Sequence, residues 1–361
     1  MNMQAPVHFS TADELERALP QLAARGVTEL TVQDAAITAH KGRLLRFLQL
    51  AAEQAPDVFY TLPLEAAVLD MDVAKAASRL YCSIELPLRG TSKGGAYLFD
   101  KKLYARRAAM LNELGLVFGV SLDFAATAGD AVKLFRDRLD FAASLYPNHI
   151  DFPQLDARAA GLVPPKPSAT FSTQDIQRAR EAAFACTVFY SMGRAVPWFL
   201  SALAPLKLTP SRFFQDFAEW QRVNNCGLQS DWAQRALADG GDATVAERAA
   251  EASGARKAAP APAVTHRDVE AMQLAFLRFK YEEKNKEPLF AAVTDIVHLN
   301  GALARCAGEG EESSVVLQYS PDDLLSPAAQ NIAAFSDSVC MEDCRVRVFY
   351  STERGIDWEL A

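Results

Sequence analysis

The sequence lacks the motifs that most directly assign an activity. Its five histidines form no His-x-His, His-x3-His or Glu-x2-His pair, so metal-dependent hydrolysis has no support from the sequence. No glycine-rich phosphate turn follows the first expected strand, which argues against a Rossmann nucleotide site. There is also no Cys-x3-Cys-x2-Cys loop, and therefore no set of three closely spaced thiolates to hold an iron–sulfur cluster.

Cysteine is scarce and scattered. Four of the six cysteines stand alone, which is unlike a secreted disulfide framework. Cys340 and Cys344 lie close together, but two thiolates are too few for a cluster or a structural zinc, and no third ligand follows them. We therefore predict no metal site in this chain. A reversible disulfide and plain surface thiols both stay open for this pair.

Basic charge and long apolar runs are also missing. The formal net charge is −8, which argues against nucleic acid or an anionic membrane as the main partner. No cationic stretch followed by an apolar run opens the sequence, and no stretch of about 18 apolar residues occurs in it. We expect a cytoplasmic protein with no membrane partner.

The first part of the chain alternates strand-like and helical segments, as in a parallel sheet with helical connections. Strands are expected at 28–33, 58–62, 82–86, 116–122 and 149–152, and helices near 41–54, 70–79, 100–114 and 129–146. This predicts an α/β fold, an incomplete (β/α) TIM-like barrel. A doubly wound sheet is the competing fold, because periodicity alone does not exclude it.

Changes in composition divide the chain into four parts. We predict a partial barrel over 1–160 and a helical extension packed on it over 161–238. The segment 239–264 combines glycine, alanine, proline and charge, which is typical of a linker. Residues 265–361 form a small α+β C-terminal module, a size more typical of an accessory domain.

Several segments together resemble radical S-adenosylmethionine (radical SAM) enzymes, particularly the subgroup with a cobalamin-binding domain ahead of the barrel. The passage from Phe99 to Asp151 is similar to the fifth and sixth strand units of that family, and the segment from Ser83 to Thr91 to its fourth strand. The cluster loop of the family is absent. Since the chain begins close to the first expected helix, we expect neither the first strand nor the cobalamin domain in it.

The resemblance also implies where S-adenosylmethionine would bind. The implied positions are Glu85 on the fourth strand, Ser121 and Asp123 on the fifth, and Gln154 after the sixth. Polar side chains at the carboxyl ends of parallel strands converge at the mouth of a barrel, where ligands bind. For each residue the alternative is a hydrogen bond that only stabilises the end of the barrel.

One pair of residues indicates acid–base chemistry. His149 and Asp151 lie two residues apart on an expected strand and so share one face. They are the candidates for a general acid–base pair. The alternative is a buried histidine hydrogen-bonded to a neighbour.

Three hypotheses follow, and whether the chain is an enzyme stays open. The first is a bacterial radical-SAM-like protein without its own cluster. It is then either the downstream part of a split enzyme, whose protein partner supplies the first strand, the [4Fe-4S] cluster and cobalamin, or a pseudoenzyme that binds a small molecule or a protein. The second is a barrel enzyme without a redox cofactor, using Glu85, Asp123, His149 and Asp151. The third is an interaction protein that works through its C-terminal module and linker.

Overall fold

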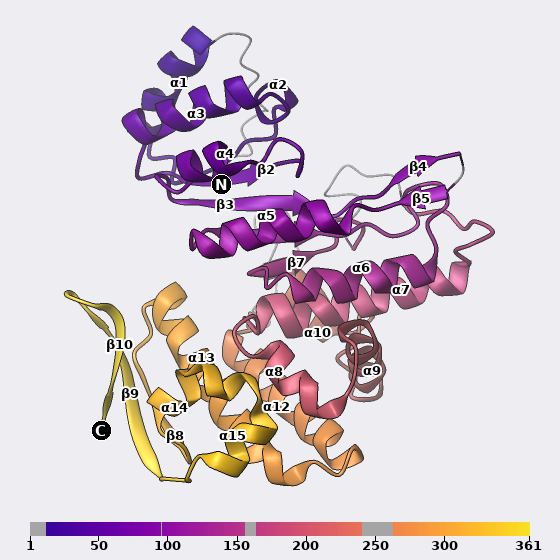
Figure 1. Ribbon diagram of the computed structural model, residues 1–361, viewed down its shortest axis with the longest axis vertical. Coiled ribbons are helices and arrows are strands. Elements are labelled where there is room, and N and C mark those ends of the chain that lie inside the picture. Colours follow the sequence, from indigo (N-terminus) through magenta and orange to yellow (C-terminus); the bar gives the residue numbers. More distant parts are fainter. Residues whose placement is uncertain (1–11, 95, 156–163, 240–262) are drawn as a thin grey trace, which may run out of the picture. The chain divides into compact units, whose positions relative to one another are not determined.

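The computed structural model describes residues 12–94, 96–155, 164–239 and 263–361 (Figure 1). Backbone contacts divide the chain into two compact units, an N-terminal unit, Met1–Ala179, and a C-terminal unit, Arg180–Ala361. Most of the predicted linker, from 240 to 262, lies outside the described residues. The four predicted parts of the chain stay predictions.

A five-stranded parallel sheet forms the centre of the N-terminal unit. Its strands are β1 (Glu29–Thr31), β2 (Phe59–Pro63), β3 (Cys82–Pro87), β6 (Val117–Ser121) and β7 (His149–Asp151). They lie in the order β1-β2-β3-β6-β7, so neighbouring strands follow one another along the chain. A barrel winds in this way, whereas a doubly wound sheet reverses its order at an internal strand. The α/β class is confirmed, and the partial barrel stays a prediction.

Helices connect these strands. They are α1 (Ala12–Ala24), α2 (Ala35–Thr38), α3 (Lys41–Gln54), α4 (Met71–Ala77), α5 (Lys101–Glu113) and α6 (Val132–Ser144). Helix α1 packs on α3, α3 on α4 and α4 on α5. Because right-handed connections between successive neighbouring strands stay on one side, the helices cover a single face of the sheet.

The two faces of the sheet differ sharply in character. The helix-covered face is apolar, and its side chains include the buried Tyr60, Ile84, Phe118, Val120 and Ile150. Phe47 of α3 packs edge-on against Tyr60, with the ring centroids 5.7 Å apart. The opposite face, called the polar face here, carries the alternate side chains of each strand. Its central and carboxyl-terminal members are Ser83, Glu85, Pro87, Gly119, Ser121, His149 and Asp151.

A β-hairpin extends from the carboxyl end of β3, where the sequence indicates only a flexible loop. Its strands are β4 (Thr91–Lys93) and β5 (Ala96–Leu98). The Tyr97 ring lies over the guanidinium of Arg138 on α6, 5.1 Å from its centre. A Cβ at Gly90 would lie 2.0 Å from that ring, so the close approach of the hairpin requires glycine.

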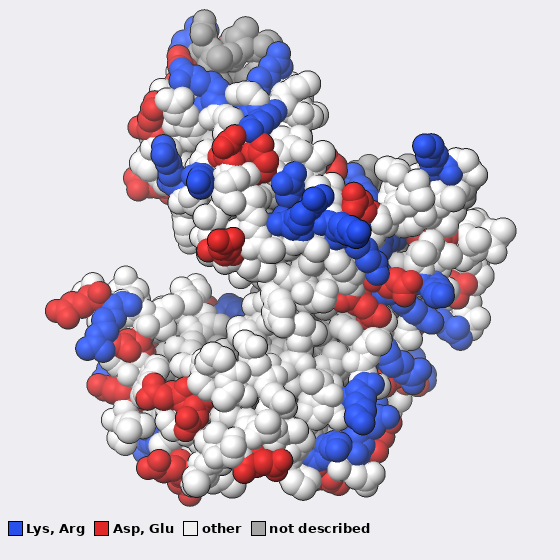
Figure 2. Space-filling view, viewed as in Figure 1, with Lys and Arg blue, Asp and Glu red and all other residues white. Residues whose placement is uncertain are grey.

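The basic residues of α5 lie on the surface of the N-terminal unit. Lys101, Lys102 and Arg106 are exposed, and their helix carries a group of basic side chains on the face drawn in Figure 2. Such exposure is typical of a solvated helix face.

Helices build most of the C-terminal unit. They are the part of α7 (Thr173–Cys186) from Arg180 onward, the π-helix η1 (Thr187–Met192), α8 (Phe199–Leu203), α9 (Pro210–Val223), α10 (Asp231–Asp239), α12 (His266–Glu283) and α13 (Phe290–Glu309), with short 3-10 turns η2 (Ala204–Leu206) and η3 (Glu287–Leu289). Phe189 packs edge-on against Phe213, Phe217 and Phe276. The aromatic core thus includes α12, beyond the predicted linker.

A three-stranded antiparallel sheet in the order β10-β9-β8 completes the C-terminal unit. Its elements are β8 (Ser313–Leu317), α14 (Pro321–Leu325), η4 (Pro327–Gln330), α15 (Ile332–Ser338), β9 (Cys344–Ser351) and β10 (Gly355–Leu360). Val346 and Val348 are fully buried in β9, which packs against α13. The last strand, β10, is an addition to the predicted elements. No helix in the described part of the chain is long and apolar enough to cross a membrane.

Candidate functional site

The strand register places Glu85 and His149 in one row across the polar face. Glu85 of β3 pairs with Gly119 of β6, and Gly119 pairs with His149 of β7. Residues that pair directly in a sheet point to the same side. The side chains of Glu85 and His149 therefore extend toward each other over the strand between them.

Gly119 has no side chain, and this leaves the space in which the side chains of Glu85 and His149 come into contact. A Cβ at position 119 would lie 2.0 Å from His149 Nε2 and 2.4 Å from Glu85 Oε2. Any side chain on β6 at this point would occupy the space that the imidazole and the carboxylate share. Gly119 is a functional position that the sequence analysis missed, although a glycine inside a strand indicates close approach of other groups.

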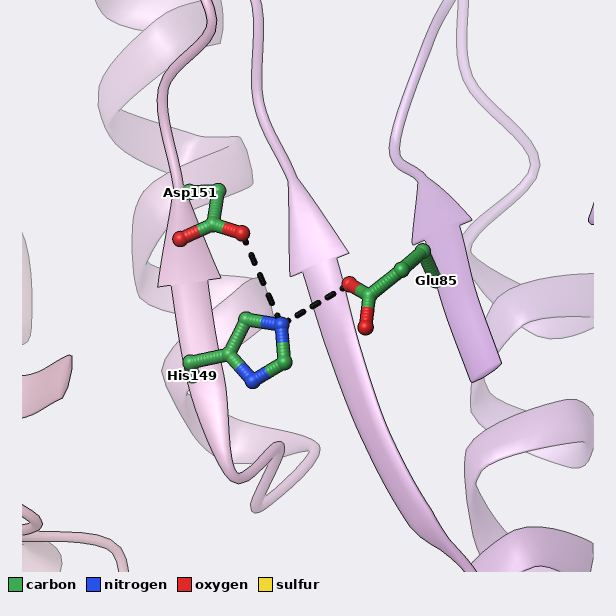
Figure 3. A group of neighbouring side chains, drawn as sticks. All are labelled: Glu85, His149 and Asp151. Carbon is green, nitrogen blue, oxygen red and sulfur yellow. Dashed lines mark hydrogen bonds and ion pairs between the residues drawn. The ribbon is translucent and has the colours of Figure 1, made fainter. Parts of the chain in front are cut away.

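Two carboxylates converge on one nitrogen of His149 (Figure 3). Nε2 lies 2.8 Å from Glu85 Oε2 and 3.5 Å from Asp151 Oδ2. The hydroxyl of Ser83 donates a hydrogen bond of 2.6 Å to the other carboxylate oxygen of Glu85, Oε1. The side chains of His149, Glu85 and Asp151 are 29%, 18% and 53% exposed, so the group is partly open to solvent.

The surroundings shift the pKa of both β7 side chains. Burial lowers the pKa of His149, but the hydrogen bond that its ring donates to Glu85 and the charges of Glu85 and Asp151 raise the pKa by more, so it lies above the ordinary value. Partial burial raises the pKa of Asp151, and the charge of His149 offsets this only in part. Such shifts are typical of groups that exchange protons near neutral pH.

Among the described residues, one group of three histidine, cysteine, aspartate or glutamate side chains could hold a metal ion. Its members are Glu85, His149 and Asp151. One ligand atom from each lies within 4.8 Å of the other two. No ion is present. The sequence predicts no metal site, because Cys340 and Cys344 supply only two thiolates and the histidines form no ligand pair; this group contains a single histidine.

Asp123 lies two residues beyond the end of β6, and its carboxylate accepts a hydrogen bond from Arg138. The guanidinium donates to Asp123 Oδ1 at 2.6 Å, to Asp130 Oδ2 at 3.0 Å and to the carbonyl of Leu88 at 3.2 Å. Arg138 is 1% exposed. The buried cation thus joins the segments that follow β3 and β6, which supports the carboxyl end of the sheet.

The remaining predicted residues take different positions. Gln154 is buried, and its amide exchanges two hydrogen bonds of 3.3 Å with the backbone of Phe124. Ser121 pairs with Asp151 in the strand register, and its half-buried hydroxyl has no hydrogen-bond partner among the described residues. The structure therefore brings together Glu85, His149, Asp151 and Ser121 of the predicted set, while Asp123 and Gln154 bond to groups of the fold.

The paired cysteines of the C-terminal unit are both free thiols. Cys340 is exposed, and Cys344 donates to the carbonyl of Tyr319 at 3.4 Å. A second histidine–carboxylate pair lies in the same unit, where His298 Nδ1 is 2.8 Å from Glu270 Oε1. Its third member is the cation Arg305, so this pair is already neutralised.

Comparison with known proteins gives few matches. No family model matches the chain, and no curated protein does. Among solved structures, it is similar to the radical S-adenosylmethionine methyltransferase TsrM from Kitasatospora setae, with cobalamin and a [4Fe-4S] cluster bound and with tryptophan substrate and the SAM analogue aza-SAM bound. Sequence identity is 14% and the TM-score 0.33 in both cases.

The similarity covers 39% of this chain and 28% and 30% of the two TsrM chains. It thus spans less than a third of the length of either structure. A likeness of this extent carries no argument about chemistry, and the function has to be argued from the residues of the site.

Proposed function

We propose that the N-terminal unit is a partial (β/α) barrel that carries out polar chemistry on a small molecule, with Glu85, His149 and Asp151 as its reactive group. The observation that carries the proposal is the convergence of both carboxylates on His149 Nε2, at 2.8 Å and 3.5 Å. Ligand sites of parallel α/β sheets lie at the carboxyl ends of the strands. Asp151 is the last residue of β7, and Glu85 and His149 lie on the same face, one row further into the sheet.

The chemistry of these groups is proton transfer or the addition of water. The carboxylates beside His149 raise its pKa and so favour the protonated imidazole, which is the form that donates a proton. Glu85, held by Ser83, orients the imidazole and stabilises its charge. Asp151 is half exposed and is the member of the group best placed to meet a substrate.

A test that needs no known substrate is to incubate the purified full chain with a cell extract of small molecules and follow their levels by mass spectrometry. We expect at least one compound to change with the wild-type protein and with His298→Ala, but not with His149→Ala. Identical profiles for the wild type and His149→Ala would refute the proposal.

The second candidate is a radical-SAM-like chain that receives its cluster from a partner protein or serves as a pseudoenzyme. It is supported by the resemblance of the strand segments and by the sequential strand order. Strand β1 pairs only with β2 among the described residues, and an unpaired edge accepts an added strand. In this candidate Glu85, Ser121, Asp123 and Gln154 contact S-adenosylmethionine, and cobalamin enters only with the partner.

Two measurements distinguish the second candidate from the first. Affinity capture from the native cell would recover a cysteine-rich or cobalamin-binding protein if the enzyme is split. Calorimetry would detect S-adenosylmethionine if its pocket persists. If neither signal appears, the second candidate is excluded. The third hypothesis, an interaction protein, would be supported if capture depended on the C-terminal unit alone.

A further inference from the structure

We infer that Glu85, His149 and Asp151 bind one divalent transition-metal ion on the polar face of the sheet. The inference extends the proposed function by naming a cofactor for the same three residues. The catalytic role of that cofactor rests on the proposed function. The binding itself is argued from the donor atoms, their spacing, their charge and their exposure.

The spacing of the donor atoms suits a metal ion. Ligand atoms about 2.1 Å from one ion lie roughly 3.0 to 3.4 Å apart at tetrahedral or octahedral angles. Here Nε2 is 2.8 Å from Glu85 Oε2 and 3.5 Å from Asp151 Oδ2, and all three donor atoms lie within 4.8 Å of one another. Small side-chain rotations would bring the three atoms to one coordination sphere.

The two carboxylates of the group also favour the binding of a cation. A ring nitrogen carries either one hydrogen or one lone pair, so Nε2 can donate a good hydrogen bond to only one of the two carboxylates. A protonated His149 supplies one positive charge against the two negative charges of Glu85 and Asp151. A divalent ion at this point neutralises both carboxylates and takes the lone pair of Nε2 as well.

The neighbouring groups fit a catalytic metal site rather than a closed structural one. Three protein ligands leave at least one coordination position for water or substrate. Asp151 is 53% exposed, so that position faces solvent. Ser83 donates to the second oxygen of Glu85 at 2.6 Å, the kind of outer contact that orients a metal-binding carboxylate.

The donor set also indicates the class of metal. One imidazole nitrogen with two carboxylate oxygens favours Mn²⁺, Fe²⁺ or Zn²⁺, whereas Mg²⁺ and Ca²⁺ prefer oxygen alone. Mn²⁺ is the most selective probe, because it binds carboxylate and imidazole but has little affinity for the free thiols of Cys340 and Cys344.

A second histidine–carboxylate pair in the chain serves as a control for metal binding. His298 and Glu270 repeat the 2.8 Å histidine–carboxylate pair in the C-terminal unit, but there the guanidinium of Arg305 contacts the other carboxylate oxygen of Glu270. Arg305 already supplies a positive charge there, so we expect no metal ion to bind at this second pair. Removal of His298 should leave metal binding unchanged.

The experiment is a Mn²⁺ titration of the metal-free full chain, in which electron paramagnetic resonance measures the free ion. We expect one bound equivalent for the wild type and His298→Ala. For His149→Ala and Asp151→Asn we expect affinity at least about tenfold weaker, since loss of an outer contact alone costs that much in other metal sites. Mg²⁺ in excess should not displace the bound Mn²⁺.

The inference would be overturned if the wild type bound no Mn²⁺, or if His149→Ala and Asp151→Asn bound it as tightly as His298→Ala. Asp151→Asn guards against a folding artefact, because this half-exposed side chain changes only in charge and circular dichroism can confirm its fold. The proposed function fails separately: metal bound without any conversion of small molecules would refute that function alone, and conversion without metal would refute this inference alone.

Discussion

The imidazole of His149 and the carboxylate of Glu85 meet at 2.8 Å across an intervening strand, in the space that a side chain at position 119 would fill. The pair therefore depends on the backbone of β6 as much as on its two members. This dependence makes the site testable without removing any of its functional groups.

Replacement of Gly119 by alanine should break the site. The new methyl group would lie 2.0 Å from Nε2 and force the imidazole away from Glu85, so Mn²⁺ affinity should fall at least about tenfold. Overpacking should also cost about 1 to 3 kcal/mol of stability. Gly42→Ala is the matched control, since a Cβ there meets nothing within 4 Å. Equal metal affinity in both variants would show that Gly119 does not shape the site.

His149 should titrate above the ordinary histidine value of about 6.5. Because its folded pKa is raised, its contribution to stability is complete below the unfolded pKa and is lost as the pH rises through the folded pKa. Glu85→Gln removes the charge and the strong acceptor, so the His149 pKa should fall. Proton NMR of the imidazole measures both values. A His149 pKa that stayed the same in Glu85→Gln would contradict the pairing.

Arg138 should contribute strongly to stability. Arg138→Met leaves Asp123 and the buried Asp130 facing each other without a cation, which should cost about 3 to 5 kcal/mol. Chemical denaturation measures the loss, and Asp130→Asn in the same chain should recover part of it. Arg222→Ala removes an exposed pair with Glu219 and should have no measurable effect. Similar small losses for both arginines would refute the buried network.

Asp295 should make the stability of the C-terminal unit depend on pH. Burial raises its pKa to about 6, although the amides of Gln318 and Tyr319 donate to it. Since the folded pKa is raised, stability is greatest below the unfolded value and falls as the pH rises through 6, by on the order of 2 to 3 kcal/mol. Asp295→Asn keeps an acceptor oxygen without the charge, so its stability should not show this fall. If the stability of the wild type and of Asp295→Asn changed with pH in the same way, the prediction would be wrong.

The sequence predicts the strands of the N-terminal unit close to their observed positions, because each strand is a short, largely apolar run between helical segments. The strand containing Ile84 and Leu86 places Ser83 and Glu85 on the other face, and this period of two marks it as a strand. The hairpin β4–β5 was missed, because the glycines of the segment Gly90–Gly95 are typical of a loop. Gly94 has φ +60° and provides the turn between its strands.

The sequence predicts the pairing of His149 with Asp151 and names Glu85 among the reactive residues, but it does not predict the contact of Glu85 with His149. That contact depends on the register of three strands, which local patterns do not specify. Asp123 lies at the predicted end of its strand, yet its partner Arg138 belongs to a helix that a local pattern cannot place. The buried cation was therefore missed, and so was the glycine between the two functional strands.

The most direct measurement is a crystal structure of the full chain grown with MnCl₂, with anomalous diffraction used to locate manganese. The account predicts a peak about 2.2 Å from His149 Nε2 and from one carboxylate oxygen each of Glu85 and Asp151. An empty site, with Glu85 and His149 held only to each other and manganese bound elsewhere or not at all, would contradict it.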